Sequence, residues 1–218
     1  MGGFDFTVIA DNLPFLWKGM QMTLLLTALA MVGGIVIGTL LALARLSSIK
    51  PLSMASAVYV NFFRSLPLIL VIFWFYFLVP LVVGQPVGGF YSVLIAFTLF
   101  EAAYYSEIIR AGISSVRRGQ VAAALALGMT YTQSMRYIVL PQAFRAMVPI
   151  LLTQAIILFQ DTSLVYVVGL HDFLVSAEIV ANRDQRLVEM YSFVAVVYLV
   201  LCFAASMGVR RLQRKVQK

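Results

Sequence analysis

The chain has 218 residues and a net charge of +7, and 62% of its residues are hydrophobic while only 11% are charged. Soluble domains contain about 45–50% apolar and about 25% charged residues, so this composition excludes a soluble globular fold. The basic residues flank apolar runs and do not form one patch, which excludes a nucleic-acid-binding protein. We therefore expect an all-α integral membrane protein.

Stretches without charged residues locate the membrane spans. A spanning helix needs about 20 mostly apolar residues, and no stretch shows the alternating polarity of a barrel strand. Glycines and a proline at 84–89 predict a turn that divides one long stretch into a hairpin. In chain order, we predict about five spans within a single domain of residues 1–218: 19–44, 64–83, 90–109, 143–160 and 187–209.

Loop charge predicts the orientation of these spans. Basic residues gather after the first span, between the third and fourth spans, and in the tail 210–218. Loops rich in Lys and Arg stay in the cytoplasm. We therefore expect the N-terminus outside the cell and the C-terminus in the cytoplasm.

Three charged residues are predicted to lie within the membrane or at its edge. Arg64 falls near the cytoplasmic boundary, Glu101 falls near mid-depth, and Asp161, followed by Thr162 and Ser163, interrupts an apolar run. Intramembrane charges commonly mark a substrate pathway, and Arg64 with Asp161 would suit the carboxylate and ammonium groups of a zwitterion.

Each of these residues also has a structural interpretation. Arg64 would serve as an interfacial anchor, Glu101 as a paired carboxyl group between helices, and Asp161 as a helix cap. Glu107 and Arg110, at i and i+3, are interpreted as an intrahelical ion pair.

The longest predicted cytoplasmic segment, 116–141, contains a short helix rich in Ala and Leu that ends near Gly128. Such a helix is too short to span the membrane. Its exposed apolar surface requires a partner that covers it, or a position at the lipid interface. Both interpretations are open from the residues alone.

The spacing in this segment resembles the EAA loop of importer permeases of the ATP-binding-cassette (ABC) class. That loop reads Glu-Ala-Ala, three residues, Gly, nine residues, Ile-x-Leu-Pro, and this chain departs from it only by Ala122 in place of Glu. The resemblance implies that the segment is a coupling helix for an ATPase, and that the polar contact of the missing Glu is absent or comes from a partner permease. The implied coupling residues are Ala122, Ala123, Ala124, Leu125, Gly128, Ile138, Leu140 and Pro141.

The resemblance covers nearly the whole chain. The segments 64–67, 100–112 and 159–164 look like the polar amino-acid branch of these permeases (histidine, glutamate and aspartate), and most resemble its glutamate/aspartate permeases. This implies the type I importer fold, with a five-helix core in the bacterial cytoplasmic (inner) membrane. It also implies that Arg64, Asp161 and Ser163 lie along the substrate path, to which the depth of Glu101 adds a fourth candidate.

The family also implies partners. These are two cytoplasmic ATPases, a second permease subunit, identical or paralogous, and an external substrate-binding protein. The chain itself has no Gly-x-x-x-x-Gly-Lys-[Ser/Thr] loop, so we expect a transport subunit rather than an enzyme, with ATP bound by a partner. One His and one Cys leave little for a metal or cofactor site, and we expect neither.

Three other classes compete with an importer permease. A stand-alone secondary transporter or channel would often show internal repeats, which we do not detect, and it gives the Ala-rich cytoplasmic helix no role. A membrane enzyme or electron-transfer subunit would need metal or haem ligands, or a nucleophile–base pair, and one His and one Cys supply almost none of these. A purely structural anchor leaves Arg64, Glu101 and Asp161 without a function.

Overall fold

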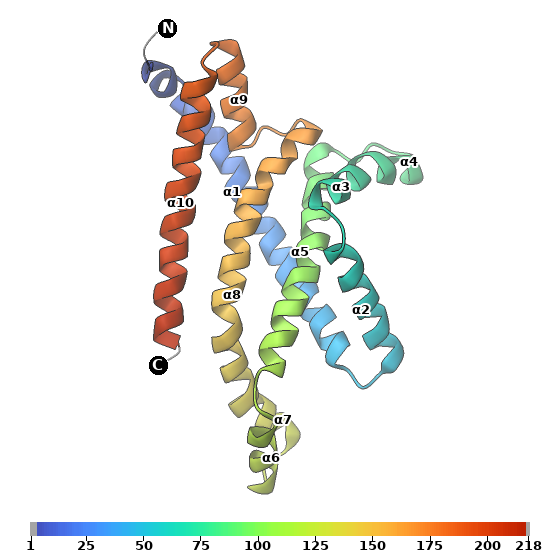
Figure 1. Cartoon of the computed structure of the whole chain (residues 1–218). Coiled ribbons are helices and arrows are strands. Elements are labelled where there is room, and N and C mark those ends of the chain that lie inside the picture. The colour runs from blue at the N-terminus through green and yellow to red at the C-terminus, as the bar shows by residue number, and fades with distance from the viewer. Residues whose placement is uncertain (1–3, 217–218) are drawn as a thin grey trace. The chain divides into compact units, whose positions relative to one another are not determined.

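A computed structural model describes residues 4–216, which form helices and connecting segments without any strand (Figure 1). Two of the shorter elements are π-helices (η1 and η2) and one is a 3-10 helix (η3). In chain order the elements are α1 Thr7–Leu46, α2 Lys50–Arg64, α3 Leu68–Phe73, η1 Trp74–Leu78, α4 Val79–Val83, α5 Gly89–Ser114, α6 Arg118–Ala126, α7 Tyr131–Ser134, η2 Met135–Val139, α8 Leu140–Asp161, η3 Thr162–Val168, α9 Phe173–Arg183 and α10 Leu187–Val216.

Within the described residues, four helical stretches are long and apolar enough to cross a membrane. These are α1, α5, the stretch Tyr131–Val168 and α10. A fifth span is formed if α2 and the stretch Leu68–Val83, which meet at a bend of 104°, count as one crossing. The expected all-α membrane fold is therefore confirmed, while the single domain and the limits of the five spans stay predictions.

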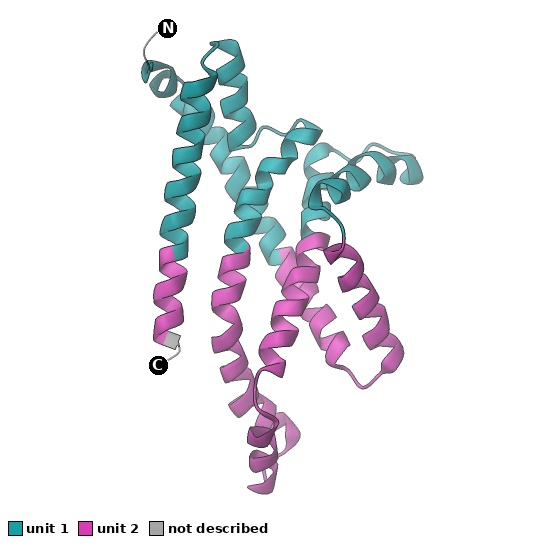
Figure 2. Cartoon of the chain, viewed as in Figure 1, with its two compact units in different colours: residues 1–32, 66–98, 155–206 teal, residues 33–65, 99–154, 207–218 magenta. Residues whose placement is uncertain are grey.

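The chain divides into two compact units (Figure 2). Unit 1 contains residues 1–32, 66–98 and 155–206, and unit 2 contains residues 33–65, 99–154 and 207–218. Because α1, α5, α8 and α10 each supply residues to both units, neither unit is a contiguous segment of sequence.

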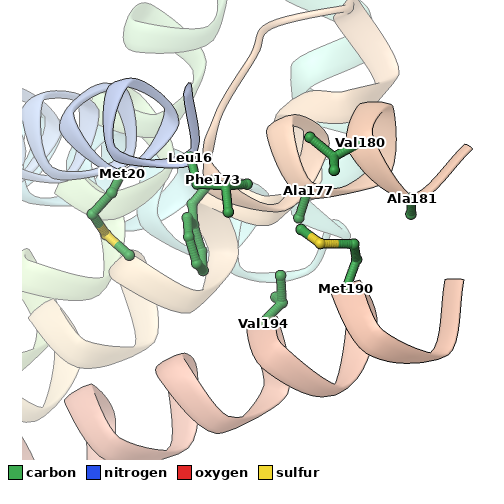
Figure 3. Packing of buried hydrophobic residues seen from close by; sticks show 8 residues of the cluster. All are labelled: Leu16, Met20, Phe173, Ala177, Val180, Ala181, Met190 and Val194. Carbon is green, nitrogen blue, oxygen red and sulfur yellow. The ribbon is translucent and has the colours of Figure 1, made fainter. Parts of the chain in front are cut away.

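The core of unit 1 is an apolar cluster in which α9 packs against the first half of α1 and the start of α10 (Figure 3). Phe173 and Val180 come from α9, and Met190 comes from α10; all three are buried. Leu16 and Met20 of α1 complete the contact. A short helix outside the long apolar runs is thereby fixed by burial of its apolar face.

Polar groups secure the start of α9. Asp172 is the N-cap, and its Oδ1 accepts a hydrogen bond from the backbone N–H of Val175 at 2.8 Å. The backbone N–H of Phe173 donates to the Thr23 hydroxyl at 3.1 Å. The first turn of a helix has N–H groups without intrahelical partners, and these side chains satisfy two of them.

Unit 2 depends on the close approach of α1 and α5. A methyl group added to Gly38 would lie 2.8 Å from Cβ of Tyr105 and 2.9 Å from the carbonyl oxygen of Ala102. Gly34, one turn earlier, faces Tyr105 and Glu101 in the same way. Small residues at this spacing allow helix backbones to pack closely in a membrane.

We expect Gly38→Ala to lower the free energy of unfolding by about 1–3 kcal/mol, the usual cost of overpacking. The backbone oxygen of Ala102 cannot move aside as a flexible side chain would. Gly208→Ala is the matched control, because nothing lies within 4 Å of its added methyl group. Thermal unfolding of the purified protein in detergent measures both variants, and equal transition temperatures would contradict the close packing.

Asp172 lies outside the spanning stretches, and its buried carboxyl group should make the stability of the protein depend on pH. The side chain is fully buried, its Oδ2 has no hydrogen-bond partner within the described residues, and burial raises the pKa of this carboxyl group from 3.8 to about 6. The folded protein therefore binds a proton that the unfolded chain releases between these values, and stability should fall by roughly 3 kcal/mol as pH rises from about 4 to 6.

Asp172→Asn keeps an acceptor oxygen for Val175 and removes the charge, so we expect hydrogen exchange of the α9 amides to lose most of this pH dependence. Asp184→Asn is the control, because hydrogen bonding to the Arg183 guanidinium lowers the pKa of that carboxyl group. An unchanged pH profile in Asp172→Asn would show that another group is responsible.

Candidate functional site

Arg64 is the last residue of α2, where the chain bends by 104° before α3. The sequence Ser65-Leu66-Pro67 explains the bend, because Pro67 disfavours helical geometry in the residue before it and begins the next helix as its N-cap. The Arg64 side chain thus extends from a helix end, and 41% of it is exposed.

Unit 2 gathers three guanidinium groups, one of them that of Arg64, around the carboxylate of Glu107. Glu107 forms ion pairs with Arg45 through Oε2 and with Arg110 through Oε1, and Arg110 Nε donates to Oε2 at 3.3 Å. Nη1 of Arg64 lies 4.0 Å from Oε2 of Glu107. The Arg64 guanidinium lies 5.6 Å from the centroid of the Tyr104 ring, within range of a cation–π interaction. The i,i+3 pair Glu107–Arg110 is confirmed, but the two further arginines were not predicted.

Glu101 is fully buried in α5. Both of its carboxyl oxygens accept from Nε2 of Gln154 in α8, each at 3.2 Å. A buried carboxyl group joined to an amide on a neighbouring helix matches the structural interpretation that the sequence left open.

Asp161 and Ser163 belong to unit 1, at the point where α8 changes into η3. Asp161 is the N-cap of η3 but its side chain makes no capping hydrogen bond. Both side chains are half-buried, and in the described part of the chain neither has a hydrogen-bond partner. Thr162 between them is buried and donates to the carbonyl oxygen of Phe159 at 2.7 Å. Asp161 and Ser163 therefore keep polar atoms available for a ligand.

The expected coupling segment of unit 2 folds as α6 followed by α7, η2 and the start of α8. Within α6, Ala124 is buried against the chain while Ala122, Ala123 and Leu125 are exposed. Leu127, directly after the helix, is 85% exposed. Gly128 has φ +84°, a left-handed conformation that favours glycine, and its N–H donates to the carbonyl oxygen of Leu125. The helix ends where the sequence predicted, with an apolar surface facing outward.

Hydrogen bonds hold the coupling segment to α8. Gln142 Nε2 donates to Oε1 of Gln120 at 2.5 Å and to the carbonyl oxygen of Ile138 at 2.9 Å. Thr130 and Gln133 form a capping box at the start of α7. Ile138 and Leu140 are half-buried and Pro141 is exposed.

A groove of about 770 Å³ runs beside α6 in unit 2. Its lining is mostly apolar and includes Leu43 and Leu46 of α1, Ala122 and Leu125 of α6, and Tyr131 of α7. Three of the predicted coupling residues, Ala122, Leu125 and Leu140, therefore line a mostly apolar groove.

Of the other predicted site residues, Arg64 and Glu101 belong to unit 2, without a direct contact between them among the described interactions, and Asp161 and Ser163 belong to unit 1. The pairing of Glu107 with three arginines was not predicted from the sequence. Its only sequence signal was the pair with Arg110, because Arg45 and Arg64 are distant along the chain.

Known proteins similar to this chain cover nearly all of it. It is 52% identical to the glutamate/aspartate import permease protein GltK of Escherichia coli O157:H7, over 97% of this chain and 98% of that protein. It is 37% identical to the probable glutamine ABC transporter permease protein GlnM of Bacillus subtilis strain 168, over 97% and 98% of the two chains.

A solved structure of an amino acid ABC transporter with histidines superposes with a TM-score of 0.91 at 33% identity, covering 97% of this chain and 98% of that one. An inward-facing methionine ABC transporter shares the fold with a TM-score of 0.77 at 22% identity, over 95% and 99% of the chains. Residues 34–218 match the family described as the inner membrane component of binding-protein-dependent transport systems. This chain therefore belongs to that family of transport permeases.

Proposed function

We propose that this chain is the permease subunit of an ABC importer that moves glutamate and aspartate inward across the bacterial cytoplasmic membrane. The observation that carries the substrate assignment is the 52% identity to a glutamate/aspartate import permease over nearly the full length of both proteins. An exposed arginine in unit 2 supports it, because a guanidinium group binds a carboxylate through two parallel hydrogen bonds.

In this proposal, the residues that contact substrate are those whose polar groups make no hydrogen bond within the described residues. In unit 2, Arg64 offers guanidinium donors to a carboxylate. Taken by itself, unit 1 offers oxygen atoms of Asp161 and Ser163 to an ammonium group. For Glu101, the bonds to Gln154 support a structural role between α5 and α8 rather than contact with the substrate.

Energy and directionality come from partner proteins in this proposal. Two cytoplasmic ATPases bind ATP, one of them on the apolar surface of α6, and an external binding protein delivers the amino acid. A second permease subunit completes the pathway, with the N-terminus of this chain outside and its C-terminus in the cytoplasm. ATP binding shifts the transporter between two states to the extent that the partners bind those states differently.

The α6 surface predicts a specific ATPase-binding defect. Leu127→Asp places a charge on a residue that is 85% exposed in this chain and that the docked ATPase would cover. Burying an unpaired carboxylate costs several kcal/mol, so we expect at least about a tenfold loss of co-purified ATPase in mild detergent.

Ile49→Asp is the control for this experiment. Ile49 is an apolar residue of unit 2 that is 59% exposed, on a segment also predicted to face the cytoplasm. It should retain the ATPase. Equal retention by both variants would show that α6 is not the docking surface.

The proposed substrate contacts predict loss of substrate-stimulated ATP hydrolysis. With the cognate binding protein and glutamate, Arg64→Ala and Asp161→Ala should each abolish the stimulation, since each removes a charged contact worth about 2–5 kcal/mol. The measurement is the rate of ATP hydrolysis by the purified importer with a panel of amino acids, in which glutamate and aspartate should stimulate the wild type most.

Arg211→Ala and Asp184→Ala are matched controls that remove the same side chains outside the proposed path, at an exposed position for Arg211 and a half-buried one for Asp184. Both should behave as wild type. Normal stimulation in Arg64→Ala and in Asp161→Ala would remove these two residues from the substrate path.

A further inference from the structure

We propose that Glu107 is the positioning residue for Arg64, and that it makes the Arg64 guanidinium a receptor for a substrate carboxylate. This inference rests on the proposed function and deepens it. Glu107 does not contact substrate in this proposal. It acts by holding Arg64 in place and by gathering two further arginines around it.

The first step concerns the hydrogen bonds of the Glu107 carboxylate. Arg45 occupies Oε2, and Arg110 bonds both Oε1 and Oε2. Nη1 of Arg64 remains 4.0 Å from Oε2, which is close enough for charge attraction but too long for a hydrogen bond. Glu107 therefore attracts the Arg64 guanidinium group, but the N–H groups of Arg64 are not used in a hydrogen bond to Glu107.

The second step concerns what Arg64 keeps available. Among residues 4–216, no hydrogen bond donated by its guanidinium group is found; its contacts are the ion pair with Glu107 and the face of Tyr104. A planar guanidinium group has five N–H donors in a fixed fork. Attraction from Glu107 and the support of the ring restrict the orientation of this fork, so little rotational freedom remains to be lost on binding a carboxylate.

The third step concerns charge. Three guanidinium groups and one carboxylate leave two positive charges in this part of unit 2. Beside a membrane, where the effective dielectric constant is low, such a surplus attracts an anion strongly. An acidic amino acid carries two carboxylates and one ammonium group, so its net negative charge complements the cluster, whereas glutamine has no net charge.

A double-mutant cycle tests whether Glu107 acts through Arg64. The whole importer, with its binding protein saturated by glutamate, is reconstituted in vesicles, and glutamate uptake per ATP hydrolysed is measured. Arg64→Lys keeps the charge but loses the fork, and Glu107→Gln loses the attraction. We expect each variant to lower the ratio about tenfold, and the double variant to be no worse than the poorer single variant.

The outcomes separate this inference from the proposed function. Defects that multiply in the double variant, or a normal ratio in Glu107→Gln beside a defective Arg64→Lys, would overturn the role of Glu107 and leave Arg64 as a substrate contact. Normal ratios in both single variants would overturn both. Glu189→Gln, which removes the partner of Arg186 in another i,i+3 pair, is the control and should match wild type.

Two additions keep the test decisive. If Glu107→Gln reduces the amount of assembled importer, Glu107→Asp keeps the charge for Arg45 and Arg110 but shortens the reach toward Arg64, and about a threefold loss is expected. The same variants are also measured in vesicles of phosphatidylcholine alone and with phosphatidylglycerol. A defect that appears only with phosphatidylglycerol would assign Arg64 to lipid headgroups and overturn the proposal.

Discussion

Hydrocarbon offers no hydrogen bonds, so each break in a spanning helix and each charge near it must find a partner within the protein or its ligand. Most of the polar groups of this chain follow that constraint. Glu101 is bonded to Gln154, and Glu107 is surrounded by arginines. Arg64 and the pair Asp161 and Ser163, whose side chains make no hydrogen bond within the described residues, lie where helices break. Unused polar groups at such breaks are the feature expected of a transport pathway.

The parts of the fold that follow from local sequence were predictable. Charge-free runs indicated a helical membrane protein because charge in hydrocarbon is so costly. The end of α6 shortly before Gly128 was predictable because a left-handed residue ends a helix and glycine accepts that conformation without strain. The assignment of the coupling segment stays a prediction that rests on spacing, since the positions of Ala122, Gly128 and Pro141 are separated by fixed distances along the chain.

The features that depend on contacts between distant segments were not predictable. The helix α2 has too few residues between Lys50 and Arg64 to cross a membrane, so a search for long apolar runs passed over it. It is held instead by bonds to other helices: the Tyr59 hydroxyl donates to the carbonyl oxygen of Leu99, and the Ser53 hydroxyl donates to that of Arg45. The ion pairs of Arg45 and Arg64 with Glu107 likewise join residues that are distant along the chain. No periodic pattern in the sequence indicates them.

The contacts of unit 2 link α6, the proposed coupling helix, to the longer helices α8 and α5. Gln142 ties α8 to α6 through Gln120, and further along α8 Met147 packs against Gly112 of α5. Gln154, near the end of the same part of α8, is bonded to Glu101 of α5. If an ATPase displaces α6, as proposed, the displacement passes to a helix that is fixed to α5 at two levels rather than to a flexible loop. Because α5 also carries Glu107, movement of the coupling helix would change the surroundings of Arg64 without any direct contact between the ATPase and the substrate.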